Sequence, residues 1–339
     1  MVQNAGARVP GAQSRSMGTR SALRGAWIAL ALVAASALLA AQGPVEPSSR
    51  ECSSINLIQT ATVGQYVFKA YKDKVKGDGC LEVHEIRRQG KIIGELIPKV
   101  VFRRTLEGMG EFTLGQPANA QDGIPKIENG TDITGRGRAD MIVINWTGGA
   151  HCCFSHFIFE VEPTLWLLAS IDDGDGDYAH FADLDGNKHY YYVGNDWTFS
   201  YWNASFGHSP APTVVLRFVE DAKPAAYHLA IDKMQRPAPT PAEWNKAVRE
   251  ATDAFGENGG FGDGIGSELW SNMLDLIYTG HSDLAWKLFD QAWPPQRPAK
   301  DKFLSGFCSQ LKTSAYWPDL EPTLQDTPPA CTAATPAPR

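Results

Sequence analysis

Residues 132–147 are DITGRGRADMIVINWT, and residues 183–198 are DLDGNKHYYYVGNDWT. With the second stretch placed under the first, the leading aspartate, the fourth-position glycine and the closing Trp-Thr pair coincide without a gap. In both, an acidic turn containing glycine precedes β-branched or aromatic residues, which are typical of a strand. A unit of about 50 residues made of short strands is typical of a propeller blade or a similar β repeat. The alternative is chance similarity within one kind of turn.

Short apolar runs around these two stretches extend the β pattern. The clearest predicted strands are 141–145, 154–161, 165–171, 190–194 and 214–219. Similar runs between residues 66 and 97, separated by Gly-containing turns, predict an N-terminal β-hairpin region. Two repeat units cannot close a propeller, which starts at about four blades. We therefore expect either an open stack completed by the N-terminal strands or a compact sandwich.

The composition changes to a helical pattern after the Pro-rich stretch 237–241. Thr240 is a candidate N-cap, with Pro241 at the first helical position and Glu243 completing a capping box. The predicted helices span 241–255, 267–278, 282–293 and 301–314. The fold class we expect is mainly β, with propeller-blade-like repeats and a C-terminal α-helical cap, so α+β overall.

The expected organisation follows from these boundaries. It comprises a signal peptide at 1–41, an N-terminal β-hairpin region at 42–126, a β core with two repeat units at 127–236, a helical region at 240–316 and a Pro-rich tail at 317–339. We expect the tail to lack regular structure apart from Cys331.

The N-terminus has the pattern of a secretory signal peptide. Residues 26–41 are uncharged and mostly apolar, follow Arg20 and Arg24, and end in small residues suited to cleavage. A membrane anchor is the alternative, but spanning a bilayer takes about 20 apolar residues. We therefore expect a secreted or periplasmic protein with no membrane span after cleavage. Met17 would begin a leader of more usual length, so the start at Met1 or Met17 stays open.

The charge balance excludes one class of partner. The chain has 31 Lys and Arg against 38 Asp and Glu, and four of the arginines lie in the expected leader, which leaves 31−4=27 basic residues. Nucleic acids and anionic lipids are bound through clustered basic side chains. We therefore expect no nucleic-acid partner.

All six cysteines lie beyond the leader, where an oxidising compartment makes disulfides the default. Fifteen connectivities are possible. Proximity in the sequence favours Cys52 with Cys80, and Cys308 with Cys331. Cys152 and Cys153 remain, and we favour a structural disulfide for them as well, either vicinal or across strands.

The segment 146–156 holds the densest collection of reactive side chains. Besides a structural disulfide, His151 and Cys153 could form a soft metal site, or a cysteine could act as a nucleophile beside a histidine. Oxidation of free thiols outside the cell disfavours both. The candidate ligand contacts in and around this segment are Trp146, His151, His156 and Trp197.

The acidic turns place oxygen-bearing side chains at alternating positions, which would aim them at one cation. They are Asp132, Thr134 and Asp140 in the first loop and Asp183, Asp185 and Asn187 in the second. Here the chain resembles the FG-GAP or VCBS repeats of secreted bacterial proteins and of the integrin alpha-subunit headpiece. The resemblance implies calcium loops between blade strands and a binding function. It covers the two loops and the strand after each, without the FG and GAP tripeptides themselves.

Both loops depart from that family's pattern. Arg136 stands where the family has Asp or Asn, so its guanidinium could lie between Asp132 and Asp140 in place of the ion. In the second loop Tyr191 replaces the last carboxylate, which leaves Asp183, Asp185 and Asn187 with the carbonyl of residue 189. The second loop is the better calcium candidate.

Six aspartates lie within residues 172–185 without a Lys or Arg among them, which adds Asp173, Asp175 and Asp177 to the candidate ligands. Two unit charges 4 Å apart repel by about 4 kcal/mol at an effective dielectric constant of 20. An ordered loop would need a cation, and calcium suits oxygen ligands best. The alternative is a solvated loop in which the charges are screened.

The function we expect is that of a secreted or periplasmic binding or scaffold protein rather than an enzyme. Its partner would be an extracellular or cell-envelope glycan or protein, because aromatic residues at 190–206 accompany the acidic loops. Calcium is the expected cofactor. If calcium is absent, Arg136 and the disulfides supply the stability. The alternative function is a secreted hydrolase with an Asp/His cluster within 151–196, using Asp175, Asp177 or Asp196 with His151, His180 or His189.

Overall fold

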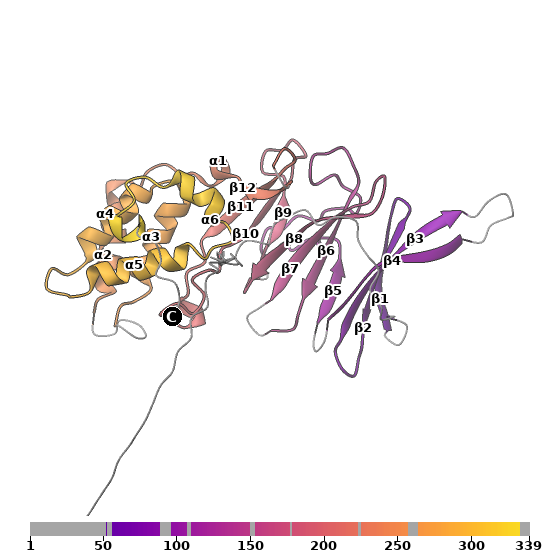
Figure 1. The fold of residues 1–339 in the computed structure, drawn as a ribbon, viewed down its shortest axis with the longest axis horizontal. Coiled ribbons are helices and arrows are strands. Elements are labelled where there is room, and N and C mark those ends of the chain that lie inside the picture. The colour runs from indigo at the N-terminus through magenta and orange to yellow at the C-terminus, as the bar shows by residue number, and fades with distance from the viewer. Residues whose placement is uncertain are drawn as a thin grey trace, which may run out of the picture. The chain divides into compact units, whose positions relative to one another are not determined.

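The computed structural model describes residues 52, 56–88, 96–106, 110–149, 153–176, 178–222, 225–256 and 264–332. The expected signal peptide at 1–41 lies outside these residues. The described residues belong to one compact unit. It combines three four-stranded antiparallel sheets with a helical C-terminal part, so the α+β class is confirmed (Figure 1). The described strands form no closed barrel or propeller.

In each sheet, strands that follow one another in the chain are neighbours. The first sheet consists of β1 (Asn56–Val63), β2 (Tyr66–Lys72), β3 (Gly79–Arg88) and β4 (Leu96–Leu106). The second consists of β5 (Glu111–Leu114), β6 (Asp140–Trp146), β7 (Phe154–Glu160) and β8 (Trp166–Gly174). The third consists of β9 (His180–Ala182), β10 (Tyr191–Asn195), β11 (Thr213–Val219) and β12 (Ala226–Leu229). The five clearest predicted strands are thus present, within a few residues of their expected ends.

One strand crosses an expected boundary. β5 lies within the region 42–126 that we expected to be an N-terminal hairpin unit, but it pairs with β6 in the second sheet. The pairing joins Leu114 to Val143 across the polar segment 115–139. The N-terminal region therefore contributes a strand to the next sheet, which the intervening turn-forming residues conceal in the sequence.

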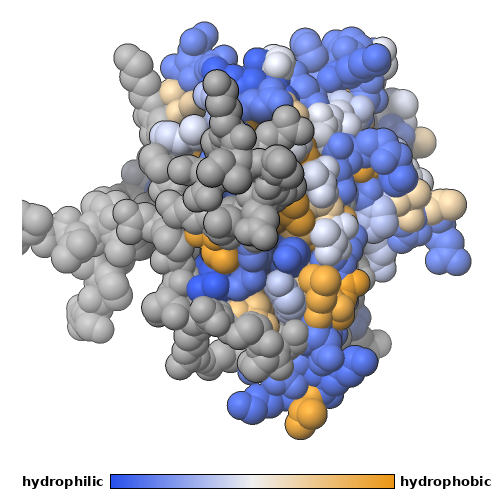
Figure 2. All heavy atoms as spheres, turned by 90° about the vertical axis from the view of Figure 1, so that its right-hand side faces the viewer, coloured by the Kyte–Doolittle hydropathy of each residue, from blue (hydrophilic) through white to orange (hydrophobic). Residues whose placement is uncertain are grey.

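The second sheet is buried on both faces. Alternate side chains along a strand point to opposite sides, and those of the second sheet join two different apolar clusters. Met141, Val143 and Phe159 pack with first-sheet residues such as Phe68, with the Phe68 and Phe159 rings 5.5 Å apart. Ile142 and the other side chains of the opposite face join a second apolar cluster with the third sheet and the helices. Figure 2 shows the side of the molecule that bears the first sheet, where hydrophilic residues predominate among the coloured atoms and apolar residues form separate patches.

The helices are α1 (Ile231–Met234), α2 (Pro241–Asp253), α3 (Glu268–Tyr278), α4 (Ser282–Ala292), α5 (Lys300–Leu311), α6 (Trp317–Leu320) and α7 (Pro329–Thr332). The predicted capping box is confirmed, since the Thr240 hydroxyl accepts a hydrogen bond from the Glu243 amide and the Glu243 carboxylate accepts one from the Thr240 amide. The tail differs from our expectation, because α6 and α7 are helical turns. Leu320 of α6 and Cys331 of α7 are buried in the core, and this burial explains why the two turns have regular structure.

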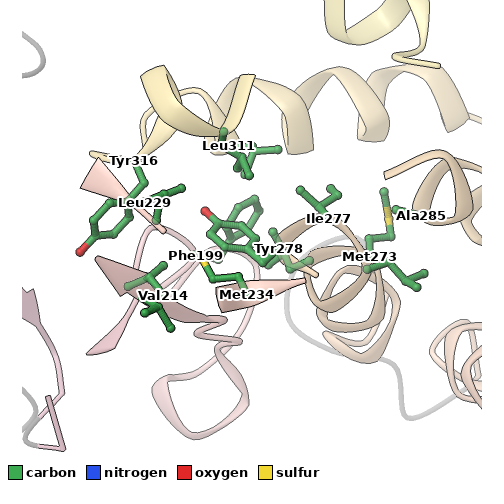
Figure 3. Close-up of a cluster of buried hydrophobic side chains, with 14 of the residues drawn as sticks. Phe199, Val214, Leu229, Met234, Met273, Ile277, Tyr278, Ala285, Leu311 and Tyr316 are labelled. Carbon is green, nitrogen blue, oxygen red and sulfur yellow. The ribbon is translucent and has the colours of Figure 1, made fainter. Parts of the chain in front are cut away.

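The helices pack on the third sheet through a common apolar core. Val214 of β11 and Phe199, in the loop after β10, meet Tyr278 of α3 and Leu311 of α5 in this core (Figure 3). Two disulfides are confirmed as expected: Cys52–Cys80, which attaches Cys52 to the inner strand β3 of the first sheet, and Cys308–Cys331 between α5 and α7. The second therefore fixes the start of the tail to the helical region.

Candidate functional site

The strand directions separate the candidate residues into two groups. The two Asp loops precede β6 and β10, whereas the acidic segment 172–176 contains the end of β8 and the segment 196–208 follows β10. A Cβ atom on Gly135 would lie 3.9 Å from His189, so the two Asp loops are neighbours. A Cβ atom on Gly174 would lie 3.2 Å from Trp197, so the two later segments are also neighbours. The five described aspartates of the acidic cluster thus lie at opposite ends of the strands, with Asp172, Asp173 and Asp175 at one end and Asp183 and Asp185 at the other.

The two Asp loops have the same backbone hydrogen bonds. In the first, Asp132 accepts from the amides of Arg136 (3.1 Å) and Gly137 (2.7 Å). In the second, Asp183 accepts from the amides of residues 187 (3.1 Å) and 188 (2.8 Å), which occupy the corresponding positions 51 residues later. Gly137 and Lys188 both adopt the left-handed backbone conformation, with φ of 71° and 66°. Each leading carboxylate therefore closes its own turn.

Asp140 closes the first loop from its far side. Its Oδ2 atom accepts hydrogen bonds from the Ile133 amide (3.0 Å) and from the amide (3.1 Å) and hydroxyl (3.0 Å) of Thr134. The side chain is 2% exposed. Burial raises the pKa of Asp140 to about 7, although these three donors favour the charged form. The loop is thus held by its own amide and hydroxyl donors.

In the second loop, the other two candidate calcium ligands also have protein partners. Asp185 forms an ion pair with Lys233 of α1 and accepts a hydrogen bond from the Tyr191 hydroxyl (2.8 Å). These contacts hold the pKa of the Asp185 carboxyl below its usual value. The Asn187 side-chain oxygen accepts from the amide of residue 189 (2.9 Å). The oxygens as arranged do not fit a calcium ion, because Lys233 already supplies the positive charge beside Asp185.

The Arg136 guanidinium does not lie between Asp132 and Asp140, where the sequence suggested that it could replace an ion. Its guanidinium pairs with Glu160 at the end of β7 (2.9 Å) and with Glu220 after β11 (3.1 Å). The basic side chain at this position therefore bridges the second and third sheets. Among the residues that the structure describes, no three His, Cys, Asp or Glu side chains are grouped closely enough to hold a metal ion.

At the opposite end of the strands, an aromatic surface adjoins the acidic segment. We define the aromatic surface as Trp197, Tyr201 and Phe206, together with Tyr178, which follows the acidic segment in the sequence. The Trp197 and Phe206 rings are stacked with centroids 5.5 Å apart, and the Tyr201 ring lies 5.7 Å from that of Phe206. The Ser200 hydroxyl donates to the Asp175 carboxylate, which joins the surface to the acidic segment. Tyr178 and Tyr201 are each 59% exposed.

Other aromatic side chains of the same segment point into the protein. Phe199 contacts Phe307 of α5 at 5.1 Å, and Trp202 meets Trp270 of α3 edge-on at 5.2 Å. The segment is therefore anchored in the helical core while it presents Tyr201 outward. Tyr201 and Asn203 both have positive φ, 58° and 52°. Such conformations are sparsely populated by residues other than glycine, and they cluster at functional sites.

Trp146 lies at the same end of the second sheet. Its ring is stacked on Phe154 at 6.1 Å, and its indole N–H donates to the Gly149 carbonyl (3.3 Å). Cys153 is disulfide-bonded. The positions of His151, Cys152 and Asp177 lie outside the described residues, so their predicted roles stay predictions.

His156 and Asp173, two predicted site residues, form a buried pair between the second and third sheets. The His156 Nδ1 and Asp173 Oδ2 atoms are 2.6 Å apart, and the Tyr192 hydroxyl donates to the other carboxylate oxygen. Rings of Phe181 and Tyr192 contact the imidazole edge-on. Burial raises the pKa of Asp173, and the adjacent imidazole opposes that rise. Both residues are too deeply enclosed to touch a ligand at the surface.

Asp196 anchors the aromatic surface to the helices. One carboxylate oxygen accepts from the amide (2.8 Å) and hydroxyl of Thr198, and the other from the hydroxyls of Tyr278 and Ser314. The two helical partners lie 82 and 118 residues further along the chain. Neither was a sequence prediction, because a lone Tyr in α3 and a lone Ser in the turn after α5 carry no signal that would find them.

Comparisons with protein-family models, with curated proteins and with solved structures found no match. None of the helices that the structure describes has the length and hydrophobicity needed to cross a bilayer.

Proposed function

We propose that this protein is a secreted or periplasmic glycan-binding protein whose ligand contacts the aromatic surface. The observation that carries the proposal is the stack of Trp197 on Phe206 with the exposed Tyr201 ring, beside the acidic segment. Tyrosine combines an apolar face with a hydroxyl that remains solvated. Sugar rings have the complementary chemistry, with apolar C–H faces and polar edges. Asp172 and Asp175 would accept hydrogen bonds from ligand hydroxyls.

The backbone of the aromatic surface supports a binding role. Asp196 and the inward Phe199 and Trp202 hold the segment on a rigid base, so the exposed rings lose little freedom when a ligand binds. Tyr201 keeps a backbone conformation that costs about 1–2 kcal/mol for a residue with a Cβ atom. Conformational cost without a packing gain is typical of binding sites.

The proposal does not require calcium. The carboxylates of the Asp loops already accept protein donors, and these loops lie at the other end of the strands from the aromatic surface. The disulfides Cys52–Cys80 and Cys308–Cys331 support an extracytoplasmic location, since such bonds persist in oxidising compartments.

The hydrolase alternative receives less support from the placement of its residues. Asp196 is buried and saturated by four donors, and His189 lies at the Asp-loop end. His180 interacts with the Tyr178 carbonyl (2.8 Å). These groups do not converge on one cavity, which paired acid and base catalysts require.

Co-sedimentation with insoluble polysaccharides tests the proposal. The native protein, Tyr178→Ala and Tyr201→Ala are mixed with peptidoglycan, chitin, cellulose and xylan, and the unbound fraction is measured. We expect binding to at least one polymer, weakened about tenfold by either substitution. Leu184→Ala is the matched control, because it removes an exposed apolar side chain at the Asp-loop end, 46% exposed against 59% for the tyrosines. Absence of binding, or equal loss in the control, would exclude the aromatic surface as a glycan site.

A further inference from the structure

A second candidate site lies in the helical region, at a place to which the sequence did not point. A pocket of about 260 Å³ lies between the Pro-rich segment 236–240, α2 and α3. Its apolar lining includes Pro239, Trp244 and Leu276. Ordinary small-molecule pockets begin at roughly 300 Å³. The pocket is therefore suited to a ligand smaller than a typical cofactor.

The charged side chains around the pocket are already matched. Arg236 pairs with Asp275 (3.2 Å), and Lys246 pairs with Glu250 (3.6 Å). Glu243 is engaged in the capping box with Thr240. Binding of an ion would have to break one of these pairs. The lining thus favours a neutral ligand.

Three lining side chains keep hydrogen-bonding capacity. The Trp244 indole N–H has no acceptor among the described residues, and the Asn272 amide donates to the Glu268 carbonyl (2.8 Å), which leaves its oxygen available. His281 Nε2 lies 2.8 Å from the Arg236 carbonyl. Because a carbonyl only accepts, Nε2 carries the proton and Nδ1 of the neutral ring is an acceptor. The pocket lining therefore offers one donor, which is the indole N–H itself, and two acceptors.

We propose that this pocket binds a neutral saccharide of one or two rings. A sugar hydroxyl both donates and accepts, so it can satisfy the indole N–H as well as the Asn272 and His281 acceptors. The C–H face of the sugar would pack on Trp244, whose ring is positioned by the Lys287 ammonium 5.6 Å from its centroid. The site is independent of the aromatic surface and does not rest on the function proposed there.

Ligand-observed NMR and calorimetric titration test the inference. The probes are glucose, N-acetylglucosamine, cellobiose and N,N′-diacetylchitobiose, each added to the native chain. We expect at least one to bind, with affinity reduced tenfold or more in Trp244→Ala and several-fold in Asn272→Ala. Leu184→Ala, at the Asp-loop end and outside both sites, should bind the same sugar unchanged. Tyr201→Ala, measured alongside, separates this pocket from the aromatic surface. Thermal melts of each variant verify folding. If Trp244→Ala does not fold, the binding measured for Asn272→Ala tests the inference.

Three results would overturn the inference. The first is that none of the four sugars binds. The second is that binding persists in both Asn272→Ala and Trp244→Ala, and the third is that only Tyr201→Ala abolishes binding. Three competitors are included: phosphate as an anion, spermidine as a cation, and the Pro-rich peptide ATPAPR, which has the sequence of residues 334–339. Displacement of the sugar by any of them would show that the pocket selects charge or a Pro-rich segment instead.

Discussion

The His156 imidazole and the Asp173 carboxylate approach to 2.6 Å at a place where both side chains are at least 98% buried. A buried charge without its partner is strongly unfavourable, whereas the pair itself adds little stability. The two residues are on neighbouring strands, β7 and β8, beside the Tyr192 hydroxyl of the third sheet. This contact therefore ties the register of one sheet to the position of the next.

His156→Ala should lower the free energy of unfolding by about 3–5 kcal/mol, because it leaves the Asp173 carboxylate buried without the imidazole. Asp173→Asn should partly restore stability in the His156→Ala background. Urea denaturation of both single variants and the double variant measures the coupling. His189→Ala, an exposed histidine at the Asp-loop end, is the control. Additive effects of the two substitutions would contradict a direct interaction.

Asp140 should make stability depend on pH. Its pKa is about 7 in the folded protein against an ordinary value of 3.8, so between these values the folded state binds more protons than the unfolded state. The free energy of unfolding should therefore fall as pH rises from about 4 to about 7, by at most about 4 kcal/mol from this group. Comparison with Asp140→Asn at each pH isolates the effect. Parallel curves for the two proteins would show that Asp140 titrates normally.

Millimolar calcium should leave the melting temperature of chelator-treated protein unchanged. The carboxylates of Asp132, Asp140 and Asp183 accept protein donors, and Lys233 pairs with Asp185. Thermal melts with and without calcium provide the measurement. A rise in melting temperature that disappears in Asp183→Ala combined with Asp185→Ala would contradict this expectation and establish a calcium-braced loop.

Tyr201→Gly should separate stability from binding. Glycine adopts a φ of 58° without the strain that tyrosine incurs, and this offsets its larger loss of backbone entropy on folding. We expect an unchanged or slightly higher melting temperature together with weakened polysaccharide binding. Tyr178→Gly should weaken binding without raising the melting temperature. A large fall in the melting temperature of Tyr201→Gly would indicate that the ring is a packing residue.

The strands and helices could be predicted because their signals are local. The apolar run that begins at Met141 and the Thr240 capping box each need only a few neighbouring residues. The pairing of β5 with β6 could not be predicted, since a long polar segment separates them. The Asp loops were ambiguous for a different reason. An aspartate followed by glycines can direct its carboxylate at a cation or at the amides of its own turn, and the residue that decides at Asp185 is Lys233, 48 residues away.

The candidate site was predicted only in part. Trp197, a predicted ligand contact, is part of the aromatic surface, and Asp175, a predicted metal ligand, is joined to it through Ser200. His156 and Asp173 are interior. Strand alternation gives the face on which a side chain lies, but it does not show that both faces of the second sheet are covered. That covering depends on contacts between distant elements.

The carboxylate of Asp196 also limits how this chain can be divided or recombined. Removal of the helical region at the Pro-rich segment 237–241 would take away Tyr278 and Ser314 and leave Asp196 without two of its four hydrogen-bond donors, beside the exposed core of the third sheet. A truncated β fragment should therefore aggregate rather than act as an autonomous module. Any exchange of the helical region during evolution or engineering would have to carry these two hydroxyls with it, or replace Asp196 in the same step.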